Sequence, residues 1–228
     1  MTVLKLLCYN VRSVRDDADA LARVMRAAAP DVAIIQEAPR MFRWRSKSAA
    51  LARRAGLVQV AGGRVAGANL ILSSLAVTVV ATRDIPFSAD RNLHRRGAAL
   101  AHLRLRDSEF VIAGTHLDLV EVPRLRHLDE LANAANQLAP LAPLIVGGDM
   151  NAVPGSATWR RLGRIGLDIW PQVGNGKGFT YPSHEPVRRI DAVFVDRAIT
   201  PLSAEVVAGP DVEVASDHRP LVVQLELP

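Results

Sequence analysis

The chain of 228 residues contains little cysteine and few aromatic residues. Its one cysteine, Cys8, lies in the apolar run "VLKLLCYN". It can form no intramolecular disulfide and no zinc site by itself, so we expect a buried structural thiol. Aromatic residues make up 4% of the chain and apolar residues 49%, which predicts a large core built mainly of aliphatic layers. This composition excludes a disulfide-rich scaffold and a generally disordered chain.

Long hydrophobic runs are also missing. No apolar run approaches the ~20 residues that a membrane-spanning helix needs, and no basic segment followed by a long apolar one opens the chain. If Met1 is the true start, we expect a cytoplasmic protein without a membrane span. We also expect a monomer that folds as a single domain over residues 1–228, because no linker or low-complexity segment divides the sequence.

Acidic residues are outnumbered by basic ones. There are 28 Lys and Arg against 23 Asp and Glu, a net charge of +5, and Arg greatly outnumbers Lys. The guanidinium group matches pairs of phosphate oxygens, so this surplus suits a phosphate-bearing partner. A genome with Arg-rich codon usage explains the surplus equally well. The charge alone therefore decides little.

The hydrophobic pattern predicts strands and helices in alternation. Strands are expected at residues 3–11, 31–37, 57–60, 68–73, 76–83, 97–106, 109–117, 143–151, 189–195, 203–209 and 221–227. Helices are expected at 16–29, 42–56, from Pro123 to 138, and at 156–164, with irregular segments at 84–96 and 174–186. Two strand–helix–strand units, 3–37 and 109–151, resemble each other and suggest two similar halves. In layered α/β folds, functional residues gather where such strands end.

Carboxylate, carboxamide and imidazole side chains recur at the predicted strand ends. They are Asn10, Glu37, His116, Asp118, Asp149, Asn151, Asp217 and His218. Each one alone is typical of a turn or of a satisfied structural group. Asp191 differs, because it interrupts the apolar strand "RIDAVFV", where an unpaired charge is costly and requires a partner.

If several of these carboxylates converge, a cation is needed. Two like charges 4 Å apart repel by about 4 kcal/mol at an effective dielectric constant of 20. A hard divalent cation offsets this repulsion, and oxygen ligands such as Glu37, Asp217 and Asn10 suit Mg²⁺ or Mn²⁺. Zinc fits less well, because the sequence has no cysteine cluster and no paired-histidine helix motif.

Seven short motifs stand in a recognisable order along the chain. They are "YNVR", "IIQE", "RRGAAL", "THLD", "GGDMN", "RRIDAVFV" and "SDHRP". In this order the chain resembles the endonuclease/exonuclease/phosphatase superfamily, which includes deoxyribonuclease I and exonuclease III, from about residue 3 to 226. The resemblance implies an α/β fold (α+β by some schemes), a four-layer α/β/β/α sandwich of two packed mixed β-sheets flanked by helices. It also implies metal-dependent hydrolysis of a phosphoester bond.

The resemblance implies roles for the residues of these motifs. Glu37 matches the principal metal ligand, with Asn10 and Asp217 nearby as further or outer-shell ligands. Asp149 matches the carboxylate that positions or deprotonates the attacking water, and Asn151 matches the carboxamide that orients water and phosphate.

His218 and His116 match imidazoles that contact the scissile phosphate. Asp191 matches the carboxylate that hydrogen-bonds the His218 ring, which would explain its place in an apolar strand. Arg96 resembles the arginine that contacts a phosphate oxygen, although Arg95 could be mistaken for it.

Three further residues are predicted to contact the substrate. Asn69 stands roughly where many relatives have a tyrosine, and Asp118 follows His116 at the rim of the site. Lys177 lies in the flexible Gly-rich segment at 174–186. Together with Arg95, they complete the predicted substrate-binding set.

The resemblance defines the reaction type better than the substrate. A DNA endo- or exonuclease is the first prediction, because basic residues cluster at 42–54 and 91–96. A phosphatase or phosphodiesterase that acts on a small molecule or lipid headgroup, such as an inositol phosphate or sphingomyelin, is the second. A non-catalytic nucleic-acid-binding module is the third, and the complete set of catalytic residues argues against it. The basic residues are Arg43, Arg45, Lys47, Arg53, Arg54, Arg91, Arg95 and Arg96.

Overall fold

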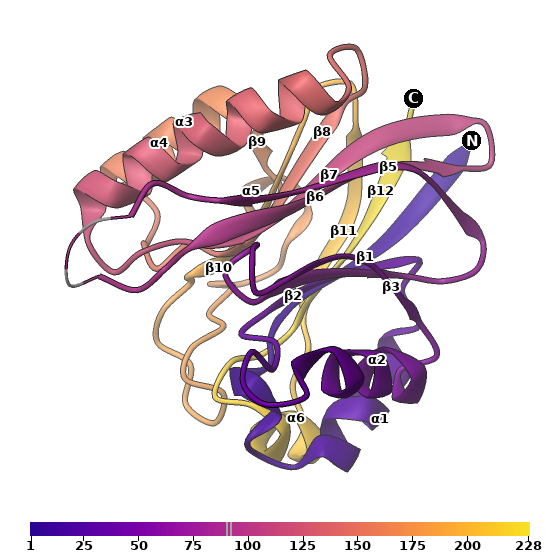
Figure 1. Ribbon diagram of the computed structural model, residues 1–228, viewed down its shortest axis with the longest axis vertical. Helices are drawn as coiled ribbons and strands as arrows, with labels where there is room; N and C mark the ends of the chain where they lie inside the picture. The colour runs from indigo at the N-terminus through magenta and orange to yellow at the C-terminus, as the bar shows by residue number, and fades with distance from the viewer. Residues whose placement is uncertain (90, 92) are drawn as a thin grey trace.

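Two six-stranded mixed sheets stack face to face, and helices cover the outer face of each sheet (Figure 1). The computed structural model describes residues 1–89, 91 and 93–228. Aliphatic residues of both sheets fill the space between them, including Leu6, Ile112 and Val223. This is the four-layer α/β/β/α arrangement that the sequence motifs predict.

The first sheet carries the N-terminal half of the chain and its last two strands. In spatial order its strands are β11 (Thr200–Val206), β12 (Leu221–Leu227), β1 (Thr2–Asn10), β2 (Val32–Gln36), β4 (Asn69–Ser73) and β3 (Val58–Gly63). Helices α1 (Ala18–Ala28), α2 (Trp44–Arg54) and α6 (Pro210–Ala215) cover its outer face. β1 and β12 are antiparallel neighbours, so the two chain ends lie close together in Figure 1.

The second sheet carries the middle of the chain. In spatial order its strands are β5 (Val77–Pro86), β6 (Gly97–Leu105), β7 (Ser108–His116), β8 (Leu144–Asp149), β10 (Asp191–Val195) and β9 (Leu167–Asp168). Helices α3 (Glu121–Leu138) and α4 (Ala157–Ile165) cover its outer face. A short helix, α5 (Trp170–Val173), follows β9, and a 3₁₀ turn (Arg12–Val14) follows β1.

Each sheet has a strand–helix–strand unit at its centre. β1 and β2 run parallel and are joined by α1, which begins after Asp17; that side chain accepts hydrogen bonds from the backbone N–H groups of Asp19 and Ala20. β7 and β8 also run parallel and are joined by α3. The similarity of the two predicted units therefore extends to their topology. It places the ends of four central strands where the two sheets can share one site.

The two sheets pack tightly where Ile34 of β2 meets β7 and β8. A Cβ atom on Gly114 would lie 2.7 Å from Ile34 Cγ2, and one on Gly147 would lie 2.6 Å from Ile34 Cδ1. Only glycine leaves room for the isoleucine at these two positions. Cys8 is also fully buried, as expected, against the side chain of Gln36.

The sequence pattern misplaces several element ends and misses the shortest elements. β5 continues to Pro86, so the segment predicted to be irregular from residue 84 begins as a strand; Asp90 and Asn92 of that segment lie outside the described residues. α3 begins at Glu121, and Pro123 lies in its first turn. β9, α5 and α6 were not predicted, because elements of two to six residues carry too few positions to show a period. Within the described residues, no helix is long and apolar enough to cross a membrane.

Candidate active site

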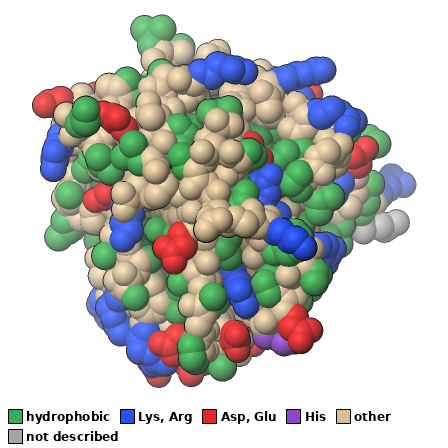
Figure 2. All heavy atoms as spheres, turned by 180° about the vertical axis from the view of Figure 1, so that it is seen from behind, with side chains coloured by type: hydrophobic (Ala, Val, Ile, Leu, Met, Phe, Trp, Pro, Cys, Tyr) green, Lys and Arg blue, Asp and Glu red, His purple; other side chains and the backbone are tan. Residues whose placement is uncertain are grey.

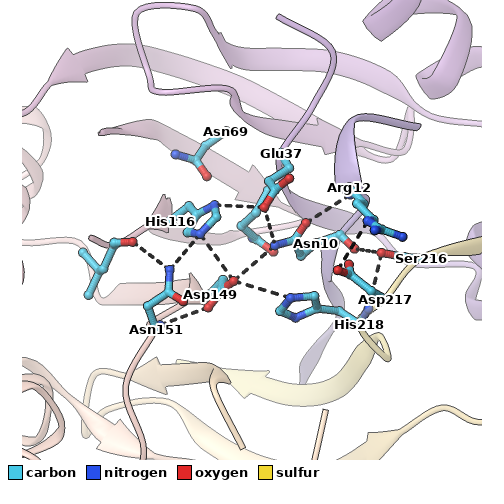
Figure 3. Close-up of polar contacts among 12 residues, drawn as sticks. Asn10, Arg12, Glu37, Asn69, His116, Asp149, Asn151, Ser216, Asp217 and His218 are labelled. Carbon is cyan, nitrogen blue, oxygen red and sulfur yellow. Dashed lines mark hydrogen bonds and ion pairs between the residues drawn. The ribbon is translucent and has the colours of Figure 1, made fainter. Parts of the chain in front are cut away.

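Polar side chains from both sheets meet at one edge of the sandwich (Figure 3). Four come from the ends of the central parallel strands, and two come from antiparallel neighbours that begin at the same edge. They are Asn10 at the end of β1, Glu37 after β2, His116 at the end of β7, Asp149 at the end of β8, Asp191 at the start of β10 and His218 before β12. The structure thus brings together six of the residues that the motifs single out.

Asp149 lies at the centre of this group. Strand register pairs it with His116 of β7 on one side and with Asp191 of β10 on the other. The preceding Gly148 has φ = 155°, and a Cβ atom there would lie 1.9 Å from the carbonyl oxygen of Thr115. Only glycine allows β8 to approach β7 so closely at this point. The glycine before the aspartate therefore holds the carboxylate beside His116.

The carboxylate of Asp149 is almost fully buried and has polar neighbours on every side. Oδ1 accepts a hydrogen bond from the backbone N–H of Asn151 at 2.9 Å, and Oδ2 accepts one from Asn10 Nδ2 at 3.1 Å. Oδ2 also lies 3.4 Å from His116 Nε2 and 3.7 Å from His218 Nε2. One oxygen is thus fixed by the backbone, and the other faces the groups that could act on a substrate.

His218 and Asp191 form a buried pair. The distance between His218 Nδ1 and Asp191 Oδ2 is 2.8 Å, and the ring of Tyr181 packs 4.9 Å from the imidazole. Burial by itself would lower the pKa of His218, but the carboxylates of Asp191, Asp149 and Asp217 outweigh burial and raise the pKa to about 9. The imidazole is therefore protonated at neutral pH. The partner that Asp191 requires inside its apolar strand is His218.

His116 differs from His218 in its protonation state. Asn151 Nδ2 donates to the carbonyl oxygen of Leu117 at 3.0 Å, which fixes the amide, and donates to His116 Nε2 at 2.9 Å. The ring therefore accepts at Nε2 and carries its proton on Nδ1. Burial lowers the pKa of His116 to about 4, so this imidazole is neutral. Its Nδ1 is buried, has no hydrogen-bond partner among the described residues and lies 3.9 Å from Glu37 Oε1.

Asn10 joins the two central carboxylates. Its Nδ2 donates to Glu37 Oε1 at 3.3 Å as well as to Asp149. Its Oδ1 accepts from the backbone N–H of Arg12 at 3.1 Å, and its carbonyl oxygen accepts from Ser216 Oγ at 2.7 Å. The contacts of the side chain orient its amide so that the nitrogen, rather than the oxygen, points toward the carboxylates.

Glu37 and Asp149 form a donor set that fits a hard divalent cation. Glu37 has φ = 51°, and its carbonyl oxygen accepts from the backbone N–H of Ser13, so a turn holds the residue outside the strand. Its side chain is 39% exposed and reaches a cavity of about 200 Å³. Carboxylate oxygens beside an open cavity are the ligands that Mg²⁺ and Mn²⁺ prefer. Asn10 suits an outer-shell position around such an ion better than direct coordination, because its amide oxygen already accepts a hydrogen bond.

A second group of possible ligands fits a metal ion less well. One ligand atom each of Asp149, Asp191 and His218 lies within 4.8 Å of the others, and all three residues are buried. The imidazole of His218 is hydrogen-bonded to Asp191 and carries a proton that a metal ion would have to displace. Asp217, also predicted as a ligand, is paired with Arg12 at 3.4 Å and is 33% exposed. The donor set at Glu37 is therefore the better fit.

Several basic side chains reach the cavity beside Glu37. Arg15, Arg40, His94 and Arg96 reach it. Arg96 is half-buried, burial lowers its pKa, and its buried Nε has no hydrogen-bond partner among the described residues. A buried guanidinium N–H without a partner is costly, and an anion in the cavity would satisfy it.

The predicted substrate-binding residues are dispersed. Asn69 is buried and donates to the carbonyl oxygens of Ala66 and Gly97, which ties β4 to the start of β6 beside Arg96. Asp118 is also buried, and its Oδ1 accepts from the backbone N–H of Val120. Arg95 is exposed and lines a larger neighbouring cavity.

Lys177 lies outside the cavity beside Glu37. It stacks 5.5 Å from the ring of Phe179 and lines a separate cavity with Trp170 and Arg219. Its segment contributes to the site through other residues: Tyr181 packs on His218, and the backbone N–H of Asp191 donates to Thr180 Oγ1. The flexibility expected of a Gly-rich segment led to the prediction that Lys177 binds the substrate. In the structure, the aromatic and hydroxyl residues of the segment make the contacts with the site.

The basic surface predicted on α2 is partly engaged in contacts of its own. Arg45 stacks 4.5 Å from the ring of Trp44, and Arg54 pairs with Asp19 of α1. Three residues that sequence analysis missed are Arg12, Ser216 and Arg40. Arg12 and Ser216 belong to the motifs "YNVR" and "SDHRP". Their closeness in sequence to Asn10 and Asp217 could have predicted that they lie at the site.

Several solved structures share this fold. An endonuclease/exonuclease/phosphatase from Bacteroides vulgatus superposes with a TM-score of 0.86 at 18% identity, covering 100% of both chains. A mannosyl-6-phosphatase from Bacteroides thetaiotaomicron gives 0.84 at 16% identity, covering 98% of this chain and 100% of that one. TDP2 from D. rerio, complexed with a single-strand DNA product, gives 0.75 at 16% identity, covering 99% and 100%. At these identities the likeness concerns the fold.

A comparison with curated proteins finds no match to this chain. A family model, by contrast, matches residues 7–218, and its description is Endonuclease/Exonuclease/phosphatase family. The matched range contains every residue of the site described above. Since the match spans most of the chain, the protein belongs to the endonuclease/exonuclease/phosphatase family.

Proposed function

We propose that the protein is a nuclease that hydrolyses a phosphodiester bond of DNA with the help of Mg²⁺ or Mn²⁺. Family and fold support a metal-dependent phosphoesterase. One observation carries the proposal further: the Asp149 carboxylate stands between a neutral His116, a protonated His218 and the amide of Asn10. A base, a fixed positive charge and hydrogen-bond donors thus meet beside a cavity that has an unpartnered arginine N–H.

Each side chain then has a distinct task. Asp149 Oδ2 accepts the proton of the attacking water, while the backbone N–H of Asn151 holds the other oxygen of that carboxylate. The protonated His218 stabilises negative charge on the phosphate oxygens, and Asp191 keeps its ring in place. No covalent intermediate with the enzyme is needed.

The remaining groups bind and orient the phosphate. Arg96 lines the cavity, and its buried Nε–H has no partner among the described residues. Asn151 holds His116 by a hydrogen bond to Nε2. Glu37 would hold the divalent cation, with Asn10 beside it. When bound, such an ion neutralises charge on a phosphate oxygen and on the leaving oxygen.

Nucleic acid is the first choice of substrate because the basic groups lie around the cavity itself. Arg15, Arg40 and Arg96 line it, and a phosphate backbone needs such contacts. The complex of D. rerio TDP2 with a single-strand DNA product supports this choice at the level of the fold. A small phosphoester is the second choice, since the cavity has a volume of only about 200 Å³. The mannosyl-6-phosphatase also superposes more closely on this chain than TDP2 does.

A substrate panel tests the proposal. Plasmid DNA, single-stranded DNA, RNA, bis-p-nitrophenyl phosphate and inositol phosphates are assayed with Mg²⁺, with Mn²⁺ and with EDTA. We expect DNA cleavage that EDTA abolishes, and we expect Asp149→Asn to lower turnover by at least ~10²-fold, because it removes the base. Cleavage of inositol phosphates without any nuclease activity would rule out the nucleic-acid substrate.

A matched substitution controls for the change of charge. Asp129→Asn alters an exposed carboxylate that pairs with Arg161 on the outer helical layer, so turnover is expected to stay at the native level. Near-native turnover of Asp149→Asn would contradict the role of Asp149 as the base.

A further inference from the structure

A second cavity continues from the catalytic one toward the edge strands β3 and β5. It measures about 690 Å³, and it shares Arg40, Gly67, Ala68 and Arg96 with the catalytic cavity. Its other basic residues are Arg64 and Arg95. We call this cavity the arginine groove. Because the two cavities have walls in common, a ligand held by Arg96 extends into the arginine groove if it is longer than one phosphate.

The arginines of the groove differ from other arginines of the chain in their ionic contacts. No carboxylate in the described part of the chain pairs with Arg40, Arg64 or Arg95, and all three are exposed. Arginines elsewhere do pair, as Arg23 does with Asp211 and Arg189 with Asp168.

The contrast extends to the molecular surface. On the face shown in Figure 2, blue basic and red acidic side chains are interspersed. Like charges that converge without counterions repel one another, and an anionic ligand relieves this repulsion. The arginine groove therefore concentrates uncompensated positive charge directly beside the catalytic residues.

Apolar side chains stand next to these charges. Met41 is 76% exposed and Val65 is 56% exposed, although both are large hydrophobic residues. Phe87 forms a rigid wall, because it is buried and its ring stacks 4.6 Å from that of His127. A groove that combines positive charge with apolar surface suits a single strand, which offers phosphates and unpaired base faces together. A duplex offers phosphates at its surface and keeps its base faces stacked inside.

We propose that the arginine groove binds the part of a nucleic-acid single strand that adjoins the scissile phosphate. Arg40, Arg64 and Arg95 hold the neighbouring phosphate, and the base lies against Met41 and Val65. The inference rests on the proposed function and names its substrate class: a single strand with at least one phosphate beyond the one that is cleaved.

Binding in the absence of metal tests the arginine groove separately from catalysis. The triple variant Arg40→Gln, Arg64→Gln, Arg95→Gln is compared with the native protein by fluorescence anisotropy of a labelled oligothymidylate, in EDTA, over a series of salt concentrations. Each phosphate contact on a single strand contributes about 0.7 to the slope of log K against log salt concentration, so loss of the contact with the neighbouring phosphate should lower the slope by about 0.7. The affinity at low salt should fall at least ~10-fold.

A second triple variant removes the same charge elsewhere. Arg106, Arg164 and Arg197 are exposed, and none of them lines the arginine groove or the catalytic cavity. Their replacement by Gln should leave the salt slope at the native value. Equal losses in the two triple variants would show that net charge, rather than the arginine groove, governs binding, and would overturn the inference.

Competition and kinetics complete the test. Unlabelled single strand should displace the probe better than a duplex with the same number of phosphates, and better than inositol hexakisphosphate; the reverse order contradicts a single-strand groove. The ratio of kcat/KM for oligothymidylate to kcat/KM for bis-p-nitrophenyl phosphate should fall in the groove variant.

The two proposals can fail separately. If the native protein cleaves oligothymidylate and the groove variant keeps the native salt slope, the arginine-groove inference falls and the proposed function stands. If the native protein cleaves no phosphodiester but loses oligothymidylate binding in the groove variant, the proposed function falls and the groove inference stands.

Discussion

The two histidines of the site differ in charge because their neighbours differ. His218 lies between carboxylates, and its pKa is raised to about 9 despite burial. Burial also lowers the pKa of His116, to about 4, and here the positive charge of Arg96 adds to the effect of burial. A proton donor and a neutral imidazole thus flank Asp149 at the same pH.

The charge of His218 depends on Asp191. In Asp191→Asn the main charge that raises the pKa of His218 is lost while burial remains, so the pKa should fall well below 9. An NMR titration of the imidazole in metal-free protein measures it. Turnover should fall by about 10²-fold, because the ring loses both its charge and its orientation.

The same interaction predicts how stability depends on pH. The folded-state pKa of His218 lies above the unfolded value of about 6.5, so the pair stabilises the fold fully below that pH and loses its effect as pH rises through about 9. The difference in urea stability between native protein and Asp191→Asn, in EDTA, should shrink over that range.

The exposed pair of His102 and Glu109, 2.9 Å apart, supplies the control. Glu109→Gln should change stability little at any pH. An unchanged pKa of His218 in Asp191→Asn would contradict the pairing.

At the scale of elements, strand pairing between β7 and β8 sets the spacing of the side chains proposed to be catalytic. The register places His116 opposite Asp149, and β10 continues it to Asp191. Three side chains from three strands are thereby aligned across one sheet edge. A small shift of β8 would separate all three.

Gly148→Ala tests this alignment. The added Cβ would collide with the backbone of Thr115, so we expect a loss of about 1–3 kcal/mol of unfolding free energy and a lower turnover. Urea unfolding and the phosphodiesterase assay measure the two effects.

Gly163 of α4 gives the opposite expectation for the same substitution. A Cβ atom there meets nothing within 4 Å, so Gly163→Ala should stabilise the protein by about 0.5–1 kcal/mol. If Gly148→Ala is as stable as the native protein, β8 does not depend on the close contact with Thr115.

At the scale of the whole molecule, the site lies where two similar halves meet. β1 and β2 at the centre of one sheet supply Asn10 and Glu37, and β7 and β8 at the centre of the other supply His116 and Asp149. Neither sheet alone contains the site. The packing of one sheet on the other therefore decides whether these four side chains come together.

Ile34→Ala weakens that packing. Ile34 fills the space above Gly114 and Gly147, so its truncation leaves a cavity and should cost about 2–5 kcal/mol of unfolding free energy. Thermal and urea unfolding measure the loss. Leu141→Ala, at a position 98% exposed, should change stability by no more than ~0.5 kcal/mol, and a comparable loss there would contradict the role of the inter-sheet contact.

Residue order and residue type were sufficient to predict the fold and the central residues. Periodicity located the long strands and helices, and the order of seven motifs predicted the four layers and the family. Asp191 was informative by itself, because a carboxylate inside an apolar strand needs a partner. The catalytic and metal-binding roles, the single domain, the monomeric state and the cytoplasmic location stay predictions.

Only the tertiary structure decided the charges and the neighbours. The pKa values of His218 and His116 depend on groups that lie far apart in the sequence, and Asn10 turns its amide nitrogen, rather than its oxygen, toward the carboxylates. Lys177 is basic and lies in a flexible-looking segment, yet it packs on Phe179 outside the cavity beside Glu37. The sequence determines which groups are available, because it sets their type and order. Folding determines their function, because distance and burial set each group's charge and its contacts.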